Sequence, residues 1–176
     1  LGHRHLLRGL VGVSQKERLT SLALTFRNHP RTVLNPSASL EFITDLDTRI
    51  ALIGEIGVER VVSIDFTKEL SMLGASQFVQ MLVDALQMRG LVVGPDFALG
   101  HKREGDIPAL RRLGYEKGFW LKVVDPFFME ERIIKSSSVR KMIGQGHVDE
   151  AQRMLDRPFS LTGVVVEGEK RGRLLG

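Results

Sequence analysis

Short apolar, β-rich segments alternate along the chain with segments of helical period, and this alternation restricts the fold more than any other feature. The expected strands are 21–26, 60–65, 91–94 and 119–124, and the expected helices between them are 44–56, 76–88 and 107–117. Strands separated by helices of this length form parallel βαβ units with right-handed crossovers. We therefore expect an α/β fold, with an open, doubly wound parallel sheet and helices on both faces.

The ends of the expected strands are the first places to search for a ligand site. In open parallel sheets, ligands bind beyond the carboxyl ends of the strands. Those ends fall at Phe26, Asp65, Gly94 and Val124, and each runs into polar or glycine-rich residues. Thr44 and Asp106 are the predicted N-caps of the first and last of the three helices.

Composition excludes several classes of protein. The 176 residues include no cysteine, which removes disulfides, thiolate catalysis and cysteine-bound metal centres. No apolar run approaches the roughly 18 residues that a membrane span needs, and no basic segment followed by an apolar one begins the chain. We expect neither a membrane protein nor a secreted precursor, but a protein of the reducing cytoplasm.

Charge alone does not identify a partner. The 25 Lys and Arg residues exceed the 21 Asp and Glu residues by four, which suits nucleic acid and phosphorylated small molecules equally well. One Trp and one Tyr do not provide the aromatic platforms that single-strand binders use, so we expect no nucleic-acid partner.

Two histidines are candidates for phosphate contacts. Gly2 permits close backbone approach, and His3 falls in the first turn of an expected helix, where backbone N–H groups favour an anion. The alternative for His3 is a solvated side chain near a chain end. His5 lies on another helical face, which argues against a metal pair. Pro30 holds His29 extended at the end of a strand, where it either contacts a ligand or has no functional role.

The polar segment 94–106 follows a buried strand and contains three glycines, a pattern typical of a loop that lies close to a ligand. Within it, Phe97 either stacks on a planar ring or fills the core below the loop.

Further along, Ser136, Ser137 and Ser138 open a short helix, and Arg140 projects from its first turn. Serine caps, backbone donors and a guanidinium together favour an anion site, although ordinary capping requires only one of the serines.

Five segments together resemble the FMN adenylyltransferase part of the bacterial bifunctional riboflavin kinase/FAD synthetase family. They are LGH at 1–3, TFRNHP at 25–30, VVGPDFALGHKREGD at 92–106, IIKSSSVR at 133–140 and RPFSLTGVVVEGEKRGRLLG at 157–176. The second and fourth segments are similar to the TFxPHP and ISSTxIR patterns of that family. The third follows its VGxDFxFGxxRxGD loop over most positions and, with the last segment, is the most specific.

The resemblance implies a Rossmann-like nucleotidyltransferase fold and a set of site residues. The implied catalytic residues are His3, Ser136, Ser137 and Arg140. The implied nucleotide-binding residues are Gly2, His3, Ser137 and Arg140. The implied flavin-binding residues are His29, Gly94, Asp96, Phe97, Gly100, Arg103, Gly105 and Asp106. No residue is implied as a metal ligand. The implied reaction converts ATP, accompanied by Mg²⁺, and FMN into FAD and pyrophosphate.

The chain departs from the family pattern at several points. Asn28, Leu99 and Lys135 stand where the family usually has a proline, an aromatic residue and a serine. The first histidine and the glycine-rich loop of the family's phosphate-binding signature do not occur before Leu1. We expect residues 1–156 to be the adenylyltransferase domain and 157–176 to open a kinase domain of β-barrel type, of which 159–166 is the first strand. The resemblance implies that the parent protein is also a riboflavin kinase, without kinase activity from these residues.

Two other functions remain open on the sequence. A related nucleotidyltransferase with another phosphate acceptor would keep His3 and the serine–arginine segment but would not need the 94–106 loop. A non-catalytic module that grips phosphorylated ligands or RNA would show strongly salt-dependent binding.

Overall fold

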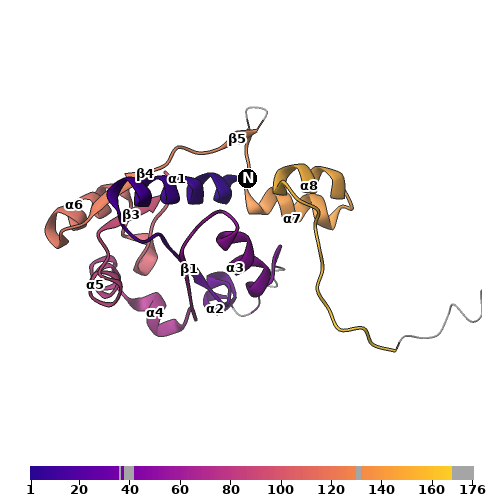
Figure 1. Cartoon of the computed structure of the whole chain (residues 1–176). Helices are drawn as coiled ribbons and strands as arrows, with labels where there is room; N and C mark the ends of the chain where they lie inside the picture. Colours follow the sequence, from indigo (N-terminus) through magenta and orange to yellow (C-terminus); the bar gives the residue numbers. More distant parts are fainter. Residues whose placement is uncertain (36, 38–41, 130–131, 168–176) are drawn as a thin grey trace, which may run out of the picture.

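The structure is a computed structural model that describes residues 1–35, 37, 42–129 and 132–167 (Figure 1). Its elements in chain order are α1 (Gly2–Glu17), β1 (Leu22–Phe26), α2 (Pro30–Leu34), α3 (Leu46–Gly54), β2 (Arg60–Ile64), α4 (Lys68–Met72), α5 (Ala75–Leu86), β3 (Gly90–Val93), the 3₁₀ turn η1 (His101–Arg103), α6 (Ile107–Lys117), β4 (Trp120–Val123), β5 (Phe128–Met129), β6 (Arg132–Ile133), α7 (Ser136–Gly144) and α8 (Val148–Leu155).

The α/β class with parallel strands, predicted from the alternating pattern, is confirmed. β1 runs parallel to β2, with Leu22 opposite Arg60, and β3 runs parallel to β4, with Gly90 opposite Trp120. The described residues form these pairs as two separate two-stranded sheets rather than one continuous sheet, and β5 and β6 form a short antiparallel hairpin. Periodicity identifies which segments are strands, but it does not determine which strands become neighbours.

The main core lies between the second parallel pair and its helices. Its buried cluster consists of Ala75, Val79, Leu110, Leu113 and Phe119, supplied by α5, α6 and the residue before β4. Helix α1 runs across the same sheet, as Figure 1 shows, and Gly9 brings it close to the Val124 side chain. None of the helices in the described residues is both long and apolar enough to cross a bilayer.

The buried face of α5 does not extend over its whole apolar stripe. Phe78, Val79 and Leu82 are buried, whereas Ala85 and Leu86, which continue the same helical spacing, are exposed. The helix ends at Leu86, the left-handed conformation of Gln87 redirects the chain, and Met88 and Leu91 then pack against the core in place of the last turn of the helix. The helical period predicts which residues share a face, but not at which residue that face stops contacting the core.

One predicted helix cap is confirmed and another is wrong by one residue. The Asp106 carboxylate accepts a hydrogen bond from the Ala109 N–H at 3.0 Å and caps α6 as predicted. Helix α3 is capped by Asp45 rather than Thr44, because the Asp45 carboxylate accepts from the Thr48 N–H at 2.7 Å. Adjacent threonine and aspartate both make good caps, so composition alone cannot choose between them.

The strand expected over 159–166 is absent. Residues 158–167 form neither helix nor strand and extend away from α8 in Figure 1. Their apolar side chains are 78–98% exposed at Leu161, Val164, Val165 and Val166. A single strand needs a ladder partner to form, and the described residues supply none to this segment.

Candidate functional site

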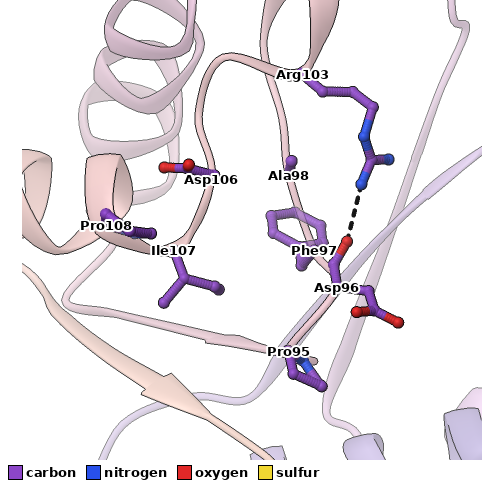
Figure 2. Close-up of a pocket in the computed structure, with 8 residues that line it drawn as sticks. All are labelled: Pro95, Asp96, Phe97, Ala98, Arg103, Asp106, Ile107 and Pro108. Carbon is purple, nitrogen blue, oxygen red and sulfur yellow. Dashed lines mark hydrogen bonds between the residues drawn. The ribbon is translucent and has the colours of Figure 1, made fainter.

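The loop between β3 and α6, residues 94–106, borders a hollow of about 580 Å³ (Figure 2). The residues around it are Pro95, Asp96, Phe97, Ala98, Arg103, Asp106, Ile107 and Pro108. Four of the eight predicted flavin-binding residues, Asp96, Phe97, Arg103 and Asp106, therefore lie around one concave surface. This surface begins where β3 ends, at the edge of the sheet where a parallel α/β fold places ligands.

The Phe97 side chain is 38% exposed, so it does not fill the core below the loop. In Figure 2 its ring projects towards the side of the hollow on which Asp106 and Ile107 lie. The Arg103 guanidinium donates to the Asp96 carbonyl oxygen at 2.9 Å and ties the two halves of the loop together. The exposed ring favours the first of the two interpretations made from the sequence, a surface on which a planar group stacks.

Two of the loop glycines serve the packing of the protein itself. A Cβ atom at Gly100 would lie 2.5 Å from the Ala75 nitrogen, and one at Gly105 would lie 2.7 Å from the Ala75 Cβ. The Glu104 carboxylate also accepts from the Ala75 N–H at 2.7 Å. The loop is thus fastened to the first turn of α5, and its predicted ligand contacts at Gly100 and Gly105 remain predictions.

Gly94 has a different environment, because a Cβ atom there would meet no other atom within 4 Å. The packing of the described residues does not require a glycine at this position. A ligand that passes close to the backbone would require one, which is consistent with the flavin-binding role predicted for Gly94.

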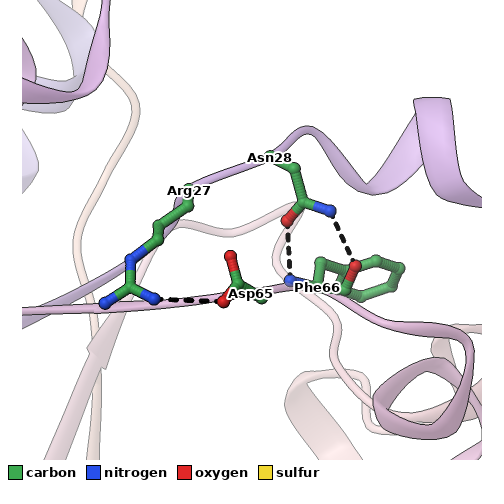
Figure 3. A network of polar contacts seen from close by, with 4 residues as sticks. All are labelled: Arg27, Asn28, Asp65 and Phe66. Carbon is green, nitrogen blue, oxygen red and sulfur yellow. Dashed lines mark hydrogen bonds and ion pairs between the residues drawn. The ribbon is translucent and has the colours of Figure 1, made fainter.

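The end of β1 is fixed to the end of β2 by side chains (Figure 3). The Asn28 amide donates to the Phe66 carbonyl oxygen at 2.8 Å and accepts from the Phe66 N–H at 2.7 Å. This pair of bonds extends the parallel pairing beyond the last residues of both strands. Beside it, Arg27 forms an exposed ion pair with Asp65 at 3.0 Å. The Asn28 side chain, where the family usually has a proline, therefore holds the chain just before His29 against the end of β2.

His29 caps α2, with its Nδ1 atom accepting from the Arg31 N–H at 3.1 Å. Desolvation lowers the pKa of His29, and the positive charges of Arg140, Arg31 and Arg49 lower it further. A neutral ring whose Nδ1 accepts carries its proton on Nε2. His29 therefore presents an N–H donor beyond the end of β1, a group that fits a phosphate or carbonyl oxygen.

Helices α1 and α7 begin next to each other, although they are more than 130 residues apart in the sequence. Gly2 lies close to the Ile134 carbonyl oxygen, just before α7, and Figure 1 shows the start of α1 beside α7. Neither helix has a side-chain cap or an acidic residue in its first turn. Asp156, near the start of α1, is bound by Arg4 at 2.8 Å. Two adjacent helix N-termini of this kind form a locus that favours an anion.

The predicted nucleotide residues lie at this locus, with one correction. Lys135, rather than a serine, occupies the N-cap position of α7, so Ser136, Ser137 and Ser138 form its first turn. The chain enters the helix one residue earlier than the serine run indicates, and the backbone of Lys135 accepts from the Ser138 N–H at 3.0 Å. The first turn of α7 thus presents serine hydroxyls and backbone N–H groups together.

His3 and Arg140 are linked electrostatically to the end of β1. Desolvation lowers the pKa of His3, although part of its side chain remains exposed, and nearby positive charges including Arg49 add to the effect. Arg140 acts in the same direction on His29. The structure therefore brings His3, His29 and Arg140 into one positively charged neighbourhood.

Arg49 also belongs to this neighbourhood, and the sequence analysis did not identify it. Its guanidinium donates to the Phe26 carbonyl oxygen at 2.9 Å and lies 5.4 Å from the centre of the Phe42 ring. An arginine in the middle of an amphipathic helix has the sequence signature of a solvated charge. Only the folded structure, in which Arg49 of α3 is hydrogen-bonded to the end of β1, reveals its position.

The chain matches the family model described as FAD synthetase over residues 1–138. The matched part contains His3, His29, the 94–106 loop and the three serines of α7, and it ends two residues before Arg140.

The curated relatives with which the chain aligns are named bifunctional riboflavin kinase/FMN adenylyltransferase. One from Buchnera aphidicola subsp. Schizaphis graminum is 30% identical over 100% of this chain and 57% of its own length. One from Escherichia coli K12 is 31% identical over 99% of this chain and 56% of its own length. The chain thus spans just over half the length of these relatives.

A solved structure supports the fold. It is a crystal structure described as a macrolide-efflux protein from Streptococcus pneumoniae, 27% identical, with a TM-score of 0.87. The similarity covers 99% of this chain and 57% of the other. The two chains share the path of the backbone over nearly all of the present sequence.

Replacing Gly105 or Gly94 with alanine should affect the stability of the protein unequally. Gly105→Ala places a methyl group against Ala75 and the Leu99 carbonyl oxygen, and should lower the free energy of unfolding by about 1–3 kcal/mol. Gly94→Ala meets open space and should change it by no more than about 0.5 kcal/mol. Urea unfolding of both variants measures the difference. Equal losses would contradict the fastening of the loop to α5.

The lowered pKa of His29 predicts a pH dependence of stability. The folded state binds fewer protons than the unfolded state, whose histidine has a pKa of about 6.5, so unfolding free energy should decrease as pH falls below that value. His29→Gln should weaken this dependence between about pH 6.5 and 5, while both proteins behave alike between about pH 7.5 and 8.5. Unfolding curves at these pH values and NMR of the ring nitrogens provide the measurement. A ring protonated on Nδ1 at pH 7.5 would refute the assignment.

Proposed function

Because the chain belongs to the FAD synthetase family, we propose that it binds ATP and FMN and transfers the adenylyl group of ATP to FMN, forming FAD and pyrophosphate. The observation that carries the proposal is the meeting of the α1 and α7 N-termini, without side-chain caps, beside His29 and Arg140. This locus favours a polyphosphate, and the 94–106 loop provides a separate hollow with an exposed aromatic ring.

The chemistry agrees with the absence of carboxylates from the predicted catalytic residues. An oxygen of the FMN phosphate attacks the α-phosphorus of ATP, the bond to the bridging oxygen breaks, and pyrophosphate leaves. The attacking phosphate is already ionised at neutral pH, so a general base is not needed. Catalysis then depends on in-line placement of the two phosphates and on positive charge around the oxygens of the α-phosphate.

Specific groups of the chain fit these tasks. We assign His3 to the α- and β-phosphates, and the first turn of α7 with Arg140 to the β- and γ-phosphates. Backbone N–H groups at the two helix starts donate to phosphate oxygens without moving during the reaction. The neutral His29 ring, which donates from Nε2, is suited to the FMN phosphate or to an edge of the flavin.

The flavin-binding part of the proposal depends on the 94–106 loop. The exposed Phe97 ring offers one face to the isoalloxazine, and Gly94 leaves space for the ligand beside the backbone. Arg103 and Asp96, joined by a hydrogen bond, hold the outer half of the loop in place.

Mg²⁺ enters the proposal as part of the ATP complex. The described residues contain no group of three or more His, Asp or Glu side chains that would hold a metal on their own. This suits an ion carried mainly by phosphate oxygens and water, as Mg²⁺ commonly is at ATP sites. When bound, it would neutralise charge on the leaving pyrophosphate.

The domain boundaries, the cellular location and the partners of the chain stay predictions. We propose residues 1–156 as the adenylyltransferase domain and 157–176 as the start of a kinase domain, and we assign no residue to the kinase activity named for the relatives. We also propose a cytoplasmic location and ATP and FMN as small-molecule partners, without a nucleic-acid or membrane partner.

Substitution at Phe97 separates the two substrates. Phe97→Ala should raise the dissociation constant for FMN by about 2- to 12-fold, the equivalent of one aromatic pair, and should leave the constant for ATP within about twofold. Calorimetry with each substrate measures both constants, and chromatography of FAD formed from FMN and Mg·ATP measures turnover. The matched control is Tyr115→Ala on α6, which removes another exposed ring.

Three results would count against the proposal. Binding of ATP without binding of FMN would favour a nucleotidyltransferase with another acceptor. Binding of RNA that weakens steeply with salt, without FAD formation, would favour the non-catalytic module. A Phe97→Ala variant that loses stability but keeps its FMN affinity would show that Phe97 supports the loop and does not contact the flavin.

A further inference from the structure

Arg49 joins three segments of the chain at the end of β1. Its Nη1 atom donates to the Thr25 Oγ1 atom at 3.2 Å and to the Phe26 carbonyl oxygen at 2.9 Å. Its Nη2 atom donates to the Thr44 carbonyl oxygen at 3.4 Å, just before α3. The Phe42 ring lies against the guanidinium, with the Cζ atom 5.4 Å from the ring centre. The side chain is therefore fixed from several directions.

No carboxylate among the described residues is hydrogen-bonded to Arg49, although the Asp45 charge acts on it from nearby. All three hydrogen-bond acceptors are uncharged, and none of the ion pairs among the described residues includes Arg49. The nearby Asp45 carboxylate is already occupied by the N–H and hydroxyl of Thr48, at 2.7 and 2.9 Å. Desolvation lowers the pKa of Arg49 and the Asp45 charge offsets only part of this, so the guanidinium is partly removed from water and incompletely compensated. Such a charge strongly favours an anion nearby.

The same charge acts on two predicted site residues from different elements. It lowers the pKa of His3 on α1 and of His29 before α2, so both rings lie within its electrostatic reach. Arg31 and Arg140 also act on His29. Arg49 therefore lies at the exit from β1, and its charge reaches the ring of His3 on α1.

We propose that Arg49 is a positioning residue of the phosphate site, which fixes the exit of β1 and supplies a permanent positive charge that a bound polyphosphate completes. This inference rests on the proposed function for its ligand, a nucleoside triphosphate. It assigns to Arg49 no contact with the reacting atoms. The residue acts through the backbone of Phe26 and through the field at His3 and His29.

Substitution of Arg49 tests charge and geometry separately, with inorganic tripolyphosphate as the probe. Arg49→Gln should weaken tripolyphosphate binding about tenfold, whereas Arg49→Lys, which keeps the charge, should stay within about threefold of the original protein. NMR titration should show the pKa of His29 rising in Arg49→Gln, a change that a purely structural role would not produce. Arg27→Gln, which removes an exposed arginine paired with Asp65, is the matched control and should alter neither quantity.

Each outcome bears on the proposal. Unchanged tripolyphosphate binding in Arg49→Gln, or an Arg49→Lys variant as weak as Arg49→Gln, would overturn it. If Arg49→Gln does not fold, NMR of the arginine side chains in the unaltered protein decides, because tripolyphosphate should shift the Arg49 signals and not those of Arg27. The probe contains no flavin, so a protein that forms no FAD would contradict the proposed function while the role of Arg49 is still judged by anion binding.

Discussion

The adjacent starts of α1 and α7 are the feature on which the rest of the site depends. Their first N–H groups have no side-chain cap, and both first turns lack acidic residues. Backbone donors left in this way are satisfied by water or by a ligand. His3 lies on α1 and Arg140 on α7, and the charges of Arg140 and Arg49 reach His29 as well. In the proposed phosphate site, backbone geometry therefore comes first and side-chain charge second.

The 94–106 loop is built on a different principle. Close contact between loop glycines and Ala75, together with the hydrogen bond from the Ala75 N–H at the start of α5 to the Glu104 carboxylate, holds the loop against the core. Rigidity of this kind lets a few exposed groups, Phe97 among them, stay in position without a ligand. The loop and the helix starts thus provide two preformed surfaces, an aromatic one beyond β3 and a positively charged one beyond β1, which suits a reaction that joins a flavin to a nucleotide.

Sequence patterns predicted most elements of the fold because apolar periodicity reports directly on local structure. They predicted the Asp106 cap, the strand ends and the grouping of Asp96, Phe97, Arg103 and Asp106. They could not show that Gly100 and Gly105 face Ala75, since a glycine required by packing looks the same in the sequence as one required by a ligand. Arg49 was missed for a similar reason. Its partners are carbonyl and hydroxyl oxygens from distant segments, and only the folded chain brings them together.

A single titration tests the central claim, that two separate surfaces bind the two halves of one product. FAD added to isotopically labelled protein should shift the backbone amide signals of Gly2 and His3, assigned to the phosphate that FAD retains, together with those of Gly94 and Phe97, all with the same dissociation constant. FMN alone should shift the second group strongly and the first group little. FAD signals confined to one group, or shifts in neither, would contradict the account.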